Sequence, residues 1–190
     1  IEAELVKLFS NAYRYINFSI SNQFYMICQS QNLNFFKIRN IMREGYMRNA
    51  NIPESGFTAG PCLLKDTMQL SSFYNHRFKL GHAAMSVNEG IPEFIITKLE
   101  KKFNLKKKTV GVLGLTFKAE TDDIRDSLAI KLVKLLRIKK IKTLQSDEFY
   151  KNDINISKND LIRRCDIIIL ATSHKAYKKL KIKKNKTVID

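Results

Sequence analysis

The sequence predicts an α/β protein whose first part is all helical and whose second part is a doubly wound parallel sheet. Through residues 1–103, apolar side chains recur every three or four positions, which is the period of a helix buried on one face. From residue 108 to residue 190, short runs rich in β-branched residues alternate with helical patterns, an order typical of parallel βαβ units. The run "IIIL" shows no polar alternation, so its strand is expected to be covered on both faces.

The longest predicted helix covers residues 2–29 and contains neither Pro nor Gly. Its apolar residues are spaced to line one face of the helix: Leu5, Phe9, Ala12, Ile16, Ile20, Phe24 and Ile27. Further helices are expected at residues 34–44, 65–76 and 79–103. A loop punctuated by Gly and Pro is expected at residues 45–62.

In the second part, four strands are expected, at residues 109–115, 141–145, 165–172 and 186–190. Helices are expected between them, at residues 127–138, 157–164 and 175–180. Strand and helix therefore alternate throughout, and the resulting sheet should be parallel with right-handed connections.

The composition is that of an ordinary globular protein with a strong positive charge. Hydrophobic residues make up 44% of the chain, and the formal net charge is +16. The Lys-rich runs at residues 101–108, 137–142 and 178–186 fit either a solvated surface or a partner that bears phosphate. Because these runs lack interleaved aromatic residues, a small anionic ligand such as a nucleotide serves as well as nucleic acid.

The sequence also bears on the compartment. No apolar run is long enough to span a membrane, and the N-terminus lacks the order of a signal peptide. The three Cys residues form an odd set without close spacing, so neither a disulfide framework nor a metal site is expected, and a reducing cytoplasm fits best. The chain opens within a helical pattern and stops within a predicted strand, which indicates a piece of a longer protein.

Cys62 stands out because it follows a loop-forming stretch, "GFTAGPCLLKD" at residues 56–66. A thiol attacks carbonyl carbon well once it is ionised, and neighbouring cations and helix N-termini favour the ionised form. Lys65 is near in the sequence, and Asp66 falls one helical turn after Cys62, where it could hold a water or a substrate hydroxyl. Spacing alone leaves Cys62 as either a nucleophile or a small structural residue.

Lys7 and Asn11 lie four residues apart on the first predicted helix, so they share a face that is distinct from the apolar one. An ammonium group beside an amide could donate hydrogen bonds to a developing oxyanion. Spacing alone favours a solvated polar face for these two residues.

The loop at residues 116–127 follows the first predicted strand and is longer than a tight strand-to-helix turn. It carries Lys118 and Arg125 at the edge of the sheet where ligands of open α/β folds gather. An Arg there can hold a phosphate or a carboxylate through two hydrogen bonds. The Gly111 and Gly114 pair before the loop lacks the full dinucleotide-binding fingerprint, so the loop is either a ligand site or an ordinary connection.

Four stretches occur in an order that resembles the UDP-glucose/GDP-mannose dehydrogenase family: "AELVKLFSNAYRYINFSISNQ", "GFTAGPCLLKDT", "SVNE" and "GVLGLTFKAETDDIRDS". The resemblance covers nearly the whole chain. It implies a helical central domain followed by a Rossmann-like C-terminal domain that binds a UDP-sugar, without the N-terminal NAD-binding domain. This chain has Ala59-Gly60-Pro61 where the family commonly has a Gly-Gly step and then Ser or His, a variant that can alter loop shape and sugar preference.

The family oxidises the C6 alcohol of a nucleotide sugar to a carboxylate and reduces two NAD. The resemblance implies that Cys62 is the nucleophile that captures the C6 aldehyde, first as a thiohemiacetal and then as a thioester. Lys7 matches the Lys that stabilises the oxyanion, Asn11 its hydrogen-bonding neighbour, and Asp66 the Asp that organises the catalytic water. Without the cofactor domain, this piece is expected to be inactive by itself.

Further roles are implied for residues of the loop. Phe117 and Lys118 match substrate-contacting residues, and Arg125 matches an Arg that reaches the NAD phosphates. Arg48 lies where the family often has an Arg that reaches the substrate of a neighbouring subunit. The helix at 2–29 resembles the one around which two subunits pair, although burial within one chain would explain its apolar face as well.

The resemblance leaves the substrate open among UDP-N-acetylmannosamine, UDP-N-acetylglucosamine and UDP-glucose, with GDP-mannose a weaker match. It assigns no role to His76, His82 or His174, and it leaves Cys28 and Cys165 as structural residues. The alternative function is a non-catalytic dimerisation module that binds a nucleotide or nucleic acid. Selective alkylation of Cys62 and stabilisation by a UDP-sugar would separate the two.

Overall fold

The computed structural model describes residues 1–57 and 60–189, and the chain divides into two compact units. The first unit spans residues 1–91 and the second spans residues 92–190. The helix α4, Lys79–Lys102, runs through this division and contributes residues to both units. Each unit has its own core and is described by itself.

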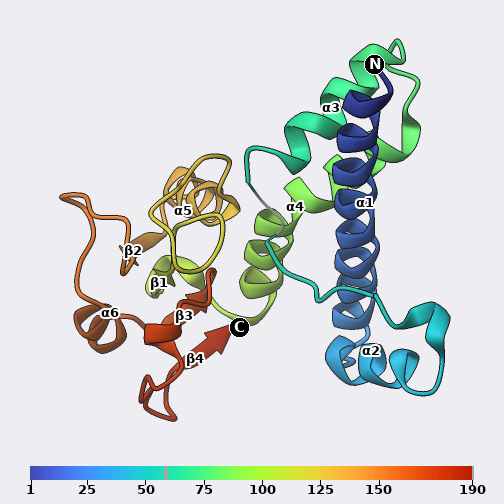
Figure 1. The fold of residues 1–190 in the computed structure, drawn as a ribbon. Helices are drawn as coiled ribbons and strands as arrows, with labels where there is room; N and C mark the ends of the chain where they lie inside the picture. Colours follow the sequence, from blue (N-terminus) through green and yellow to red (C-terminus); the bar gives the residue numbers. More distant parts are fainter. Residues whose placement is uncertain (58–59, 190) are drawn as a thin grey trace. The chain divides into compact units, whose positions relative to one another are not determined.

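In the described residues of the first unit, all regular secondary structure is helical (Figure 1). Its elements are α1 (Glu2–Ser30), α2 (Phe35–Arg43), a 3₁₀ turn (Met47–Asn49), α3 (Leu63–Phe73) and the start of α4. The side chain of Asn34 caps α2 by accepting a hydrogen bond from the backbone N–H of Lys37. The helix α3 packs along the first turns of α1, and this pairing brings the polar residues of the two helices together.

The predicted apolar face of α1 remains largely exposed, which the spacing of its residues alone did not reveal. Phe9 and Ile27 are 55% and 53% exposed, and among the stripe only Ala12 lies in the core. The helix instead buries a face of small and polar residues, including Tyr15, Ser19 and Asn22. The buried amide of Asn22 has a partner at each end: Nδ2 donates to Asn88 Oδ1 at 2.8 Å, while Oδ1 accepts from the backbone N–H of Gly56.

The second unit contains a four-stranded parallel sheet with the strand order β2-β1-β3-β4, which confirms the predicted α/β fold class. Its elements are β1 (Thr109–Leu113), α5 (Leu128–Ile138), β2 (Lys142–Ser146), α6 (Lys158–Arg164), β3 (Ile167–Leu170) and β4 (Thr187–Ile189). Each of the two central strands, β1 and β3, is buried except for one half-buried end residue, as their uninterrupted apolar runs predict. The last residue of the predicted fourth strand, Asp190, lies outside the described residues.

Two glycines permit close packing at the centre of the sheet: Gly111 lies within β1, and Gly114 directly follows it. A Cβ on Gly111 would lie 2.5 Å from Leu161 Cδ2 and 2.7 Å from Cys165 Sγ, so a side chain there would push α6 away. Gly114 has φ +81°, and a Cβ would meet the carbonyl oxygen of Thr172 at 2.3 Å. Gly111 therefore lets α6 pack closely on β1, and Gly114 lets the loop after β1 pass close to Thr172.

Two predicted helices differ from the observed elements. The helix expected at residues 65–76 ends at Phe73, because Asn75 and His76 adopt left-handed backbone conformations with φ of 52° and 57°. The helix expected at residues 175–180 is only a 3₁₀ turn at Lys175–Tyr177, where the side chain of Tyr177 enters the core.

Candidate active site

Asp66 joins α1 to α3 through two polar contacts to one of its carboxylate oxygens. Asn11 Nδ2 donates a hydrogen bond to Asp66 Oδ2 at 2.6 Å, and Lys7 Nζ lies 3.7 Å from the same oxygen. The side chain of Asp66 is 6% exposed, whereas that of Lys7 is 69% exposed. The structure therefore brings together three of the four residues predicted to carry the chemistry.

The local sequence explains this arrangement. Lys7 and Asn11 are one turn apart on α1, so both side chains reach the same place on α3. Asp66 lies in the first turn of α3, where a negative charge is favoured by the helix dipole. Because Lys7 is mostly exposed, its ion pair contributes at most about 1 kcal/mol, and the charge-assisted bond from Asn11 is the stronger of the two contacts.

Cys62 occupies the N-cap position of α3 and is exposed. Its carbonyl oxygen accepts the hydrogen bond from Asp66 N at 2.9 Å that closes the first turn, so the thiol and the carboxylate are tied to the same turn. The first backbone N–H groups of a helix have no partner within that helix, so those at the start of α3 could donate to an anion near the thiol. The preceding Ala59 lies outside the described residues.

The other two cysteines are buried and do not compete for this role. Burial raises the pKa of the Cys165 thiol to about 11, so that thiol stays protonated at neutral pH. Cys28 is a buried residue of α1. Among the three thiols, Cys62 alone is accessible to a substrate.

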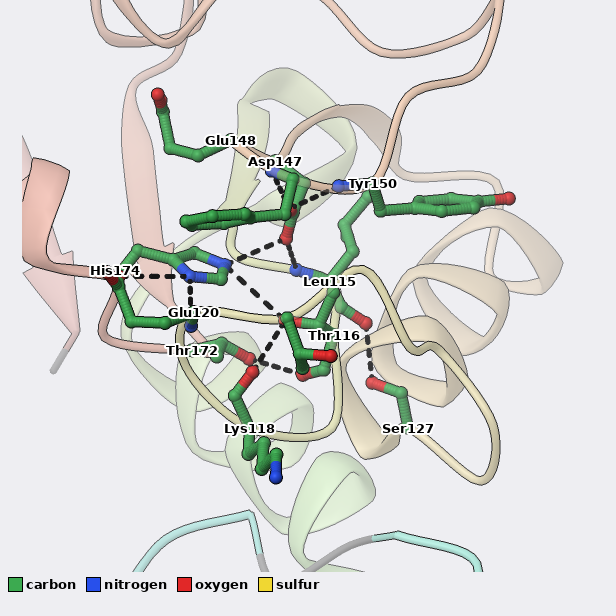
Figure 2. A network of polar contacts seen from close by, with 12 residues as sticks. Leu115, Thr116, Lys118, Glu120, Ser127, Asp147, Glu148, Tyr150, Thr172 and His174 are labelled. Atoms are coloured by element: carbon green, nitrogen blue, oxygen red, sulfur yellow. Dashed lines mark hydrogen bonds and ion pairs between the residues drawn. The ribbon is translucent and has the colours of Figure 1, made fainter.

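The loop after β1 contains Phe117 and Lys118. Figure 2 shows Lys118 on this loop. Lys118 is exposed and its Nζ lies 5.5 Å from the centre of the half-buried Phe117 ring, within the range of a cation–π contact. Thr116 Oγ1 donates to the carbonyl oxygen of Lys118 at 2.8 Å and so shapes the backbone between them. An ammonium group beside an aromatic ring can receive a phosphate next to a planar base.

Arg125 and Arg48 are both exposed. Arg125 forms a two-point contact with Asp123, in which Nη2 lies 2.7 Å from Oδ2 and Nε lies 3.0 Å from Oδ1. These hydrogen bonds lower the pKa of Asp123 below its ordinary value. Arg48 lies in the 3₁₀ turn, where Nη1 donates to the hydroxyl of Tyr46 at 3.5 Å. Anion binding by Arg125 therefore has to compete with Asp123.

Sequence reasoning missed two buried residues at the same edge of the sheet, Asp147 and His174. Both side chains are 0% exposed, and His174 Nε2 lies 3.1 Å from Asp147 Oδ2. Asp147 directly follows β2 and His174 follows β3, the two strands that flank β1, so the carboxyl ends of these parallel strands place both residues at one edge of the sheet. The sequence signal for this pair was that each residue closely follows a predicted strand. Nothing in the sequence, however, links the two residues to each other.

Models of two domains of one family match the chain. The model described as the UDP-glucose/GDP-mannose dehydrogenase family, central domain, matches residues 1–90. The model of the same family's UDP binding domain matches residues 111–190. In the described part of the chain, no helix is long and apolar enough to cross a membrane.

Individual relatives agree with these matches. A UDP-N-acetyl-D-mannosamine dehydrogenase of Pyrococcus horikoshii is 29% identical over 99% of this chain and 47% of its own length. A UDP-glucose 6-dehydrogenase of Haloferax volcanii is 33% identical over 71% of this chain and 32% of its own length. A solved structure of the UDP-D-ManNAc dehydrogenase from Pyrococcus horikoshii superposes with a TM-score of 0.83 and 28% identity, covering 95% of this chain and 44% of that one.

The chain thus spans less than half the length of these relatives. The ranges matched by the two family models include the motif around Cys62 and the loop after β1. The chain belongs to the UDP-glucose/GDP-mannose dehydrogenase family.

Proposed function

We propose that this chain is the central and UDP-sugar-binding part of an NAD-dependent nucleotide-sugar 6-dehydrogenase. The proposed reaction oxidises the C6 alcohol of a UDP-sugar to a carboxylate in two steps. The observation that carries the proposal is the exposed thiol of Cys62 on the same helical turn as Asp66, whose carboxylate also holds Asn11 and Lys7.

In the proposed chemistry, the sulfur of Cys62 adds to the C6 aldehyde that the first oxidation leaves. A carbon–sulfur bond forms, and the carbonyl oxygen becomes an alkoxide that takes up a proton. Loss of a hydride from C6 and of the proton from its hydroxyl group then converts this thiohemiacetal into a thioester. Water attacks the thioester, the carbon–sulfur bond breaks, and the thiol and the carboxylate product are released.

The neighbours of Cys62 suit these steps. The ammonium group of Lys7 and the amide of Asn11 can donate to the oxygen on C6 as negative charge develops there. Asp66 holds both donors and is the carboxylate that would orient the attacking water. Covalent capture keeps a reactive aldehyde bound between the two oxidations.

Phe117 and Lys118 are proposed to contact the UDP-sugar, with Arg48 as a further contact supplied to the substrate of a second subunit. The relatives named above act on UDP-N-acetyl-D-mannosamine or UDP-glucose by their names, and these sugars are the first candidates for this chain.

NAD would supply the acceptor for the hydride lost from C6 in each oxidation. The described residues do not by themselves form a site for a dinucleotide. In dinucleotide-binding folds, an acidic residue after the second strand holds ribose hydroxyls. Here Asp147 occupies that place, but its two oxygens accept hydrogen bonds from three backbone N–H groups and lie beside His174. Only Arg125 is proposed to contribute to cofactor binding.

The proposal includes a homodimer that forms through α1. The exposed stripe of α1 borders an apolar groove of about 430 Å³, which is lined by Leu5, Phe9, Ala12, Tyr13, Ile16, Leu70, Phe73, Tyr74 and Phe78. An apolar face of this kind commonly marks a contact between proteins. The three cysteines are unpaired, consistent with the proposed location in a reducing cytoplasm.

The proposal is tested by thermal unfolding of the chain with a panel of ligands. UDP-N-acetylmannosamine, UDP-N-acetylglucosamine and UDP-glucose should raise the Tm, with GDP-mannose, GMP and an oligonucleotide as comparisons. Lys118→Ala should lower the affinity for UDP-sugars by about tenfold because it removes a charge beside the phosphates. Lys179→Ala, an exposed Lys outside the loop, is the matched control. A Tm that rises only with the oligonucleotide would favour the alternative of a non-catalytic module.

A further inference from the structure

Asp147 accepts four hydrogen bonds at the carboxyl end of β2, where the loop after β1 passes (Figure 2). Its Oδ2 accepts from the backbone N–H of Leu115 at 2.5 Å and from His174 Nε2 at 3.1 Å. Its Oδ1 accepts from the backbone N–H groups of Phe149 and Tyr150. Burial opposes the charged form, but the three backbone donors and His174 outweigh it and lower the pKa of Asp147. Asp147 is therefore a carboxylate at neutral pH.

The hydrogen bonds of His174 define its tautomer. Its Nδ1 accepts from the backbone N–H of Glu120 at 3.0 Å, so that nitrogen carries no proton. The ring proton is then on Nε2, which donates to Asp147 Oδ2. His174 thus links the carboxylate to the far end of the loop segment 115–120.

The segment 115–120 is held at both ends by this pair. Asp147 binds the N–H of Leu115 at its start, and His174 binds the N–H of Glu120 at its end. Between them, the carbonyl oxygen of Thr116 accepts from Thr172 Oγ1 at 2.6 Å. The intervening residues Phe117 and Lys118 are the ones that the proposed function assigns to the substrate.

The backbone conformation of Glu120, at the end of segment 115–120, is one that needs stabilising contacts. Its φ is +61°, a left-handed conformation that a residue with a side chain adopts at a cost in energy. Two contacts hold it: its N–H bonds to His174, and its carboxylate accepts from the N–H of Lys175 at 2.8 Å. Without the acceptor on His174, the backbone N–H of Glu120 loses the hydrogen bond that ties this end of the segment to the sheet edge.

We propose that Asp147 and His174 are positioning residues that hold the segment 115–120 in the shape with which Phe117 and Lys118 bind a UDP-sugar. This inference rests on the proposed function. Filling the core is a poor explanation of the pair, since a buried charge and a buried imidazole cost free energy that apolar side chains would not. Every hydrogen bond recorded for the His174 side chain goes to the loop segment or to the carboxylate that holds it.

Two substitutions of His174 separate its two contacts. His174→Gln places an amide donor near the position of Nε2 and removes the acceptor for Glu120. His174→Asn places an amide oxygen near the position of Nδ1 and removes the donor to Asp147. Thr172→Val is a milder variant that removes only the hydrogen bond from Thr172 Oγ1 to the carbonyl oxygen of Thr116. Leu161→Ala is the control, because Leu161 is fully buried in the core of the same unit but belongs to α6.

The measurements are amide hydrogen exchange at Leu115 and Glu120 and the affinity for UDP by calorimetry, below the melting temperature of every variant. In His174→Gln, exchange at Glu120 should accelerate by at least about tenfold, and UDP affinity should fall by about tenfold, the loss expected from one hydrogen bond. In His174→Asn, exchange at Glu120 should stay closer to the wild-type rate than in His174→Gln. Leu161→Ala should lower the Tm and leave the exchange at Glu120 and the affinity unchanged.

Wild-type exchange and affinity in both His174 variants would overturn the inference, as would an equal loss of affinity in Leu161→Ala. If the wild-type chain does not bind UDP at all, the proposed function fails for this unit. The exchange at Glu120 then still decides whether His174 holds the segment. If His174→Gln does not fold, Thr172→Val is expected to show a smaller loss of affinity in the same direction, and wild-type affinity there would count against the inference.

Discussion

The amide of Asn11 donates a 2.6 Å hydrogen bond to the carboxylate of Asp66, a residue 55 positions away in the sequence. This contact joins the helix that carries Lys7 to the helix whose N-cap is Cys62. Any change that weakens it should loosen the pairing of α1 with α3 and displace the groups proposed to act on C6 of the sugar.

The first prediction concerns the stability of this pairing. Asn11→Ala should lower the free energy of unfolding of the first unit by about 1–3 kcal/mol, because it leaves a buried carboxylate without its main donor. Ser10→Ala is the control, since Ser10 is exposed and its hydroxyl bonds only to the carbonyl of Val6 in its own helix. Urea unfolding followed by circular dichroism measures both. Equal stability of Asn11→Ala and the wild type would show that the contact does not hold the helices together.

The second prediction concerns the stability of the second unit at acid pH. The pKa of Asp147 is lowered in the folded state, so its carboxylate stabilises the second unit at pH values above the ordinary 3.8. That stabilisation should be lost as the pH falls below 3.8 toward the lower folded-state pKa. Asp147→Asn should reduce the slope of stability against pH in this window, whereas Asp153→Asn, at an exposed site, should not. The free energy of unfolding measured between about pH 2.5 and pH 6 provides the comparison. Identical slopes in the wild type and Asp147→Asn would contradict the assignment.

The third prediction concerns self-association through α1. Phe9→Glu and Tyr13→Glu place a charge in the apolar groove, and each should shift a dimer to monomers in sedimentation velocity. Ile138→Glu is the matched control, because Ile138 is exposed to 75% but lies on α5 of the second unit. A dimer that survives both groove variants and dissociates with Ile138→Glu would place the interface elsewhere.

The sequence was most informative where a regular period or a specific motif carried the signal. The parallel sheet followed from apolar runs such as the one in β3, because a strand covered on both faces needs no polar alternation. The spacing of Lys7 and Asn11 placed both on one helical face, and the structure shows that this face meets Asp66. Local spacing was sufficient in these cases because each relationship lies within one element or one repeated unit.

Relationships between distant segments were not predictable in the same way. The sequence could not show that the apolar stripe of α1 stays exposed while Tyr15 is buried, because that depends on which face α3 and α4 cover. Asp147 and His174 are separated in the sequence and meet only because β2 and β3 end at the same edge of the sheet. Their pairing required the strand order, which single residues do not reveal.

The most direct test of the central claim is whether the sulfur of Cys62 adds to the C6 aldehyde of a UDP-sugar. A UDP-6-aldehydo-sugar labelled with ¹³C at C6 would be mixed with the chain and followed by NMR. The account predicts a new resonance of a carbon bonded to one sulfur and one oxygen with the wild type and with Cys28→Ala, and none with Cys62→Ala. A spectrum of free aldehyde and its hydrate with the wild type, or an adduct that persists in Cys62→Ala, would contradict it.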